Sequence, residues 1–181
     1  LVRSRGLGDV YKRQAHSIVG VALGLLLVFR TNTSYDRYWE GRKQLGSLCI
    51  AARNLMNQAN AVIPEEEKEY RQQIGMLIAA YMGAMRDDLR EGITLKSMGK
   101  LTGQLHQRLN QHGNKLNGLL SMLNTDLRLG VRKRWMHPSE FNPIVQSIAD
   151  LQGATHALRR IRQTPLPFSY VNQLKVFMGI Y

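Results

Sequence analysis

The most distinctive pattern in the chain is an apolar run that passes, without a proline, into a polar and aromatic segment. The run is S-I-V-G-V-A-L-G-L-L-L-V-F at residues 17–29, and residues 30–46 continue as R-T-N-T-S-Y-D-R-Y-W-E-G-R-K-Q-L-G. Apolar residues that lack a two-residue alternation favour a helix over a half-buried strand. We therefore predict one continuous helix that is apolar in its first part and polar in its second.

The apolar run is short for a membrane span. Its 13 residues would cover about 20 Å as a helix, whereas a lipid-spanning helix needs about 20 apolar residues. A buried helix of a soluble bundle is the alternative. Gly20 and Gly24 form a G-x-x-x-G pair, which lets helices approach closely in a membrane. Because each glycine costs about 1 kcal/mol relative to alanine in a helix, the pair favours tight packing against another helix.

Three apolar residues of this run share one helix face. Val21, Leu25 and Phe29 recur at every fourth position, and Gly20 and Gly24 lie beside them. If several copies of the helix surrounded an axis, the three side chains would form three apolar rings. Such constrictions gate channels by dewetting. An apolar stripe packed against a protein core has the same spacing, and spacing alone leaves both readings open.

Two motifs of the chain resemble a known family. Residues 29–46 are similar to the second transmembrane helix of the bestrophin-like chloride channel family, bacterial branch, and carry its motif at Arg30, Asn32, Tyr35, Arg37, Trp39, Glu40 and Arg42. Residues 160–170, R-I-R-Q-T-P-L-P-F-S-Y, resemble the entry into the third transmembrane helix of that family, with Pro165, Pro167 and Phe168.

The resemblance implies an all-α subunit of a homopentameric ion channel, a multi-pass protein of the bacterial inner membrane. Its partners would be the lipid bilayer, further copies of itself and permeant ions, which are chloride or another anion, with cation conduction as the open alternative. The family's pore neck would fall on Val21, Leu25 and Phe29, the residues that the helical spacing also selects. A second, cytoplasmic constriction would lie near Phe141 or Ile144.

We expect the chain to be an internal fragment of such a protein. Residues 1–14 contain no initiator methionine and do not fit the family pattern, so they are predicted to be a non-native leader. Residues 15–181 would form a partial bestrophin-like domain. Its parts would be a pore-lining helix at 15–30, cytoplasmic helices at 31–163 and the start of the next transmembrane helix at 164–181. No run reaches 18 apolar residues, so hydropathy alone predicts no transmembrane helix.

Apolar periodicity predicts the helices of the cytoplasmic part. The first helix should continue to residue 59, and no strand pattern of convincing length occurs. Pro64, followed by three glutamates, is typical of a helix start. The further helices are predicted at residues 64–89, 101–108, 116–129 and 144–161.

The chain is strongly basic, with a formal net charge of +12 and a pI near 10.3. Excess positive charge is typical of cytoplasmic segments beside membrane helices, and it attracts anions. Nucleic-acid binding is the usual alternative, but basic residues cluster only at residues 132–134 and 159–162, so we predict no nucleic-acid partner. The rival function is that of a soluble basic helical bundle that binds proteins or RNA.

The sequence contains no motif for catalysis or metal binding. The five histidines show no H-E-x-x-H spacing, and the phosphate-binding, nucleophile-elbow and dinucleotide motifs are absent. Cys49 is the one cysteine, so no disulfide can form within the chain. We predict that the protein is not an enzyme and that it holds no cofactor or metal.

Overall fold

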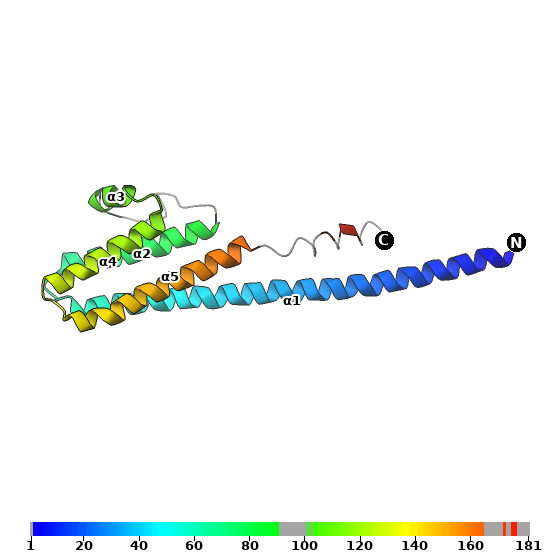
Figure 1. Ribbon diagram of the computed structural model, residues 1–181, viewed down its shortest axis with the longest axis horizontal. Coiled ribbons are helices and arrows are strands. Elements are labelled where there is room, and N and C mark those ends of the chain that lie inside the picture. The colour runs from blue at the N-terminus through cyan, green and yellow to red at the C-terminus, as the bar shows by residue number, and fades with distance from the viewer. Residues whose placement is uncertain (1, 91–100, 102, 165–171, 173–174, 177–181) are drawn as a thin grey trace. The chain divides into compact units, whose positions relative to one another are not determined.

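The computed structural model describes most of the 181-residue chain (Figure 1), namely residues 2–90, 101, 103–164, 172 and 175–176. These residues form helices joined by turns and contain no strand. The predicted all-α fold is therefore confirmed.

The chain divides into two compact units. The first contains Leu1–Arg42 and Gln163–Tyr181, and the second contains Lys43–Arg162. Helix α1 (Val2–Val62) contributes residues to both and has no break, so the predicted continuous helix is confirmed. The second unit also contains α2 (Lys68–Arg90), α3 (Gly103–Asn110), α4 (Lys115–Arg132), the short 3₁₀ helix η2 (Pro138–Glu140) and α5 (Phe141–Gln163).

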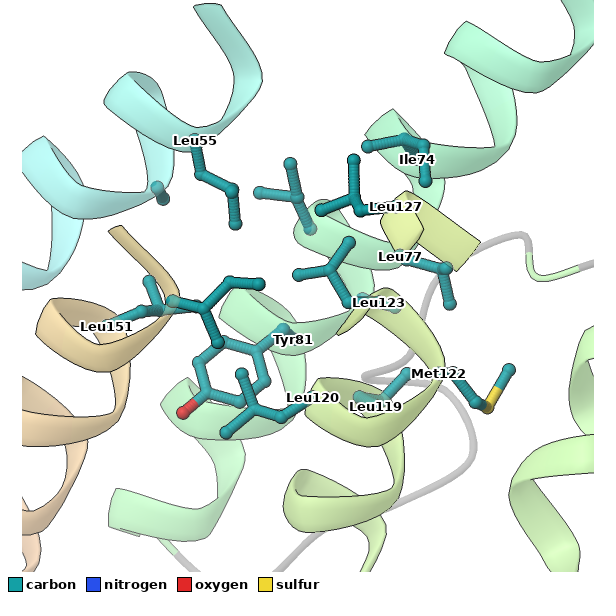
Figure 2. Close-up of a cluster of buried hydrophobic side chains, with 14 of the residues drawn as sticks. Leu55, Ile74, Leu77, Tyr81, Leu119, Leu120, Met122, Leu123, Leu127 and Leu151 are labelled. Carbon is teal, nitrogen blue, oxygen red and sulfur yellow. The ribbon is translucent and has the colours of Figure 1, made fainter. Parts of the chain in front are cut away.

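A hydrophobic core holds the second unit together. Buried side chains recur every three or four residues along its helices, which is the pattern of an amphipathic helix. Figure 2 shows how they meet, with Leu55 from α1, Ile74, Leu77 and Tyr81 from α2, Leu119, Leu123 and Leu127 from α4, and Leu151 from α5. The one polar tip among these, the Tyr81 hydroxyl, lies 2.6 Å from the Thr155 hydroxyl, so its burial leaves no orphan polar group.

The largest differences from the predicted helix starts are at α2 and α5, and local turns explain both. Helix α2 begins at Lys68 and not at Pro64, because residues 64–67 form a turn closed by a 3.2 Å bond from the Glu67 N–H to the Pro64 carbonyl. Helix α5 begins at Phe141, three residues earlier than predicted. Its start follows η2 directly, and the His137 N–H there donates to the Glu140 carboxylate at 2.7 Å.

A buried carboxylate joins three helices of the second unit. Asp126 of α4 is 7% exposed and accepts two hydrogen bonds from the Arg108 guanidinium of α3, at 2.8 and 3.2 Å. Gln73 of α2 donates a third bond at 2.7 Å, and the Tyr70 hydroxyl donates to the Asp126 backbone carbonyl. A charge that is this deeply buried is stable only when it is paired and hydrogen-bonded.

Helix α4 ends in a conformation that normally favours glycine. The N–H groups of Arg134 and Trp135 donate to the carbonyls of Val131 and Gly130, at 3.1 and 3.0 Å, as in a Schellman motif. Arg134 occupies the left-handed position of this motif, with φ of 59°. An L side chain in that region costs about 1–2 kcal/mol.

The buried face of α5 generates a prediction about stability. Ile144 has no exposed surface, whereas the adjacent Val145 is 43% exposed. We expect Ile144→Ala to lower the free energy of unfolding by about 2–4 kcal/mol because it leaves a cavity. Val145→Ala is the matched control and should change it by about 0.5 kcal/mol or less. Urea unfolding of the purified chain in detergent, followed by circular dichroism, measures both; equal losses would contradict the assigned core face.

Tyr70 generates a prediction about pH. Burial, reinforced by the charge of Asp126, raises the pKa of the Tyr70 phenol from 10 to about 12. Folding therefore favours the neutral phenol, so this contribution to stability is complete below pH 10 and is lost as the pH rises towards 12. Tyr70→Phe should therefore lose less stability than the parent chain when the pH is raised from about 9, where the contribution is complete, to about 11.5, where much of it is lost. Burial also raises the pKa of Tyr81, but Tyr81 is present in both the parent chain and the Tyr70→Phe variant, so its titration affects their stability alike. Parallel losses in the two proteins would contradict the prediction.

Candidate functional site

The predicted neck residues lie on an exposed apolar face of α1. In the first unit Val21 is 67% exposed, Leu25 is 53% exposed and Phe29 is 50% exposed. Ile18 extends the same face by one turn and is 70% exposed. A contiguous apolar surface of this kind indicates a contact with lipid, with another chain or with a ligand.

The opposite face of this helix segment is apolar and exposed as well. Leu27 on that face is 59% exposed, whereas Val28, which is 56% exposed, borders the face of Val21 and Leu25. A helix that is hydrophobic all round is normally buried in a protein or in a membrane. By length and composition α1 is able to cross a membrane, and none of its most apolar window is buried within the chain. The sequence-based expectation of no transmembrane helix was therefore wrong. That expectation considered only uninterrupted apolar runs, whereas α1 itself continues past the charged residues that end the run.

Two threonines just after the apolar run satisfy their hydroxyl hydrogen bonds within the helix. The hydroxyls of Thr31 and Thr33 each donate to the carbonyl four residues earlier, at 2.9 Å. This back-bonding supplies a partner that an apolar environment would not. A Cβ atom added at Gly20 or at Gly24 would have no other heavy atom of the chain within 4 Å beyond the helix's own backbone. The predicted packing of these two glycines against another helix thus stays a prediction.

The family-motif residues of α1 differ in their exposure. Arg37 and Glu40 are partly buried, whereas the others are exposed, namely Arg30, Asn32, Tyr35, Trp39 and Arg42. The Arg37 guanidinium donates to the backbone carbonyl of Thr164 at 2.6 Å, a residue 127 positions later. Helical spacing could not have revealed this contact.

The bond from Arg37 meets a clear chemical need. Thr164 follows the last residue of α5, and the last carbonyls of a helix have no partner inside that helix. A cation near this end also interacts favourably with the helix dipole. Arg37 therefore ties the polar part of α1 to the point where the chain leaves α5. The motif residues Pro165, Pro167 and Phe168 lie outside the described residues.

The two candidates for a cytoplasmic constriction lie in the core of the second unit. Phe141 is 8% exposed and Ile144 is fully buried. The Arg128 guanidinium lies over the Phe141 ring, 6.0 Å from its centroid. Within one chain neither side chain has the free apolar surface that a constriction would present to ions, and their role at a constriction stays untested.

Some acidic side chains of the described residues form ion pairs, and none of the described ones gather into a metal site. In that part of the chain no group of three or more His, Cys, Asp or Glu side chains could hold a metal ion. Asp88 pairs with Arg159 at 2.7 Å, and Asp87 pairs with Arg86 at 2.8 Å. The first of these pairs joins α2 to α5.

One protein-family model matches most of the chain. The family model described as "Bacterial/Fungal Bestrophin protein" matches residues 9–181. The match begins inside the segment 1–14 that the sequence analysis set aside as a leader.

Curated relatives have the name voltage-dependent anion channel-forming protein. The one from Nostoc sp. is 29% identical over 168 residues, which are 91% of this chain and 55% of that protein. The one from Ralstonia nicotianae is 30% identical over 161 residues, which are 85% of this chain and 51% of that protein. The chain thus spans about half the length of these relatives.

Solved structures share the fold. A crystal structure of a mutant bacterial bestrophin homolog from Klebsiella pneumoniae matches with a TM-score of 0.81 at 21% sequence identity. The match covers 91% of this chain and 60% of that one. At this level of identity, the likeness supports the helical architecture.

The contact between Arg37 and Thr164 generates a prediction. Arg37→Gln removes a charge-assisted hydrogen bond, so backbone amides in the last turn of α5 should exchange with solvent about tenfold faster. Arg42→Gln is the matched control, since Arg42 lies on the same helix and is exposed. Hydrogen–deuterium exchange with mass spectrometry measures the difference. Equal exchange in both variants would show that Arg37 does not hold this helix end.

Proposed function

Because this chain belongs to the bacterial and fungal bestrophin family, we propose that it forms part of a membrane channel subunit that conducts anions. The names of the curated relatives support anion conduction. The chain covers about half of those proteins, so the activity of the whole subunit is inferred from them. We propose no catalytic role, and the family offers none by name.

The observation that carries the proposal is the exposed apolar face of α1. Val21, Leu25 and Phe29 are each at least half exposed, and charged residues follow on the same continuous helix. In a ring of identical subunits, five by the family resemblance, this face would surround the axis as three apolar rings. Water leaves such a constriction readily, and ions then meet a barrier without a charged gate.

The remaining faces of the same segment would contact lipid and neighbouring helices. Leu27 would face these surroundings, and Gly20 and Gly24 would permit close approach of a neighbour. The subunit would therefore be a multi-pass protein of the inner membrane, with further spans outside this chain. A soluble basic bundle, the rival function, leaves an exposed apolar helix without a role.

The charge of the chain supports conduction of anions. A net charge of +12 raises the local concentration of anions near the protein. Apolar rings do not themselves distinguish the sign of an ion, because they contribute no fixed charge. Selectivity would therefore come from charged residues on either side of the neck.

The neck assignment generates a prediction. Alanine at all three positions, Val21, Leu25 and Phe29, should widen and wet the constriction, so that the leak conductance of the full-length channel rises about tenfold or more. Leu27→Ala is the matched control, because Leu27 is an exposed apolar residue on the opposite face. Currents across planar bilayers measure the conductance.

Two outcomes would contradict the proposal. Unchanged currents in the triple variant would refute the neck at these residues, and a full-length protein that stays monomeric without detergent would refute the channel itself. Native mass spectrometry of the purified protein distinguishes a pentamer from other assemblies.

A further inference from the structure

An open hollow lined by both apolar and basic side chains lies at the end of α4, in the second unit. Its volume is about 440 Å³, and its lining residues are Val131, Arg134, Trp135, Met136, His137 and Pro138. The size lies within the range of small-molecule pockets, which combine apolar walls with a few polar groups. Four of the lining residues are apolar or aromatic, while Arg134 and His137 are able to bind an oxyanion.

The positive charge beside this hollow is held in place. The Lys133 ammonium lies 4.3 Å from the centroid of the Trp135 ring and 5.7 Å from that of Tyr70. Arg132 and Arg134 are exposed. No hydrogen bond or ion pair engages the Arg134 side chain within the described part of the chain. The carboxylate of Glu140 is the nearest acid in sequence, and the His137 N–H donates to it.

The identity of residue 134 is the second observation. Its φ of 59° belongs to a helix end where glycine is the usual residue. Arginine adopts this conformation at the cost of backbone strain, and strained residues cluster at functional sites. Basic residues at a helix end can also serve only to balance the helix dipole. Arg132 and Lys133 can do this from unstrained positions, so dipole balance alone does not explain Arg134.

We propose that this hollow binds a small organic oxyanion, a carboxylate or phosphate attached to an apolar body. The guanidinium of Arg134 binds the oxyanion in a bidentate manner, as planar guanidinium groups do. The His137 Nδ1 is occupied by Ser139, which leaves Nε2 to face a ligand. Val131, Trp135 and Pro138 contact the apolar body, and Met136, which is 5% exposed, supports the floor of the hollow. The site lies within the second unit, and the inference does not depend on the channel function.

Phenyl phosphate is a suitable probe, and Trp135 is a built-in reporter. The chain has two tryptophans, so Trp39→Phe leaves Trp135 as the single fluorophore. In this background, phenyl phosphate should change the fluorescence in a saturable manner, and inorganic phosphate should bind more weakly because it lacks the apolar body. Both titrations use the full chain in detergent.

The variants separate binding from helix capping. Arg134→Gly should weaken phenyl phosphate binding about tenfold or more and yet raise the urea midpoint, because it relieves the backbone strain. Arg134→Asn, which also tolerates a left-handed backbone, should likewise weaken binding. Arg53→Gln removes an exposed charge from α1 and should change neither quantity.

Three results would overturn the inference. The first is a linear, non-saturable response of the parent protein to phenyl phosphate. The second is an Arg134→Gly titration that matches that of the parent, which would leave Arg134 with a role only at the helix end. The third is a lower urea midpoint for Arg134→Gly, which would remove the argument from strain.

Discussion

Helix α1 has to satisfy two different surroundings along one continuous backbone. In the first unit its apolar side chains are exposed, as Val21 and Phe29 illustrate. In the second unit the same helix buries only one stripe, in which Leu48, Leu55 and Ala59 are each at most 1% exposed. A helix satisfies its own backbone hydrogen bonds internally, so it is able to pass from an apolar to an aqueous environment without a change of structure. The proposed channel function depends on that property.

Arginine side chains complete the backbone hydrogen bonding where helices end. Arg71 donates to the carbonyls of Asn60 and Ile63 at the end of α1, and Arg37 donates to Thr164 after α5. Each of these cations lies near the negative end of a helix dipole, which is a favourable position. Part of the basic character of the chain is therefore structural. The charge that remains exposed, at Arg132 and Arg134 for example, is the part available to attract anions.

The sequence predicted those features that depend on local periodicity. The buried stripe of α4, with Leu119, Leu123 and Leu127, follows directly from spacing, and so does the shared face of the neck residues. Contacts between distant segments could not be found in this way: Arg108 and Asp126 belong to different helices, and Arg37 is 127 positions from Thr164. The starts of α2 and α5 were missed because local turns, and not periodicity, decide where these helices begin.

The apolar face of α1 cannot by itself hold a ring of subunits together. In water, burial of an exposed side chain the size of valine or phenylalanine would contribute about 1.5–3 kcal/mol, but lipid solvates such a side chain as well as a protein does. Association of subunits within a membrane then has to come from close helix packing, for which Gly20 and Gly24 leave space, and from contacts made by the second unit. In the channel proposed above, the face of Val21, Leu25 and Phe29 therefore need not hold the subunits together. Substitutions there would then change conductance before they change assembly.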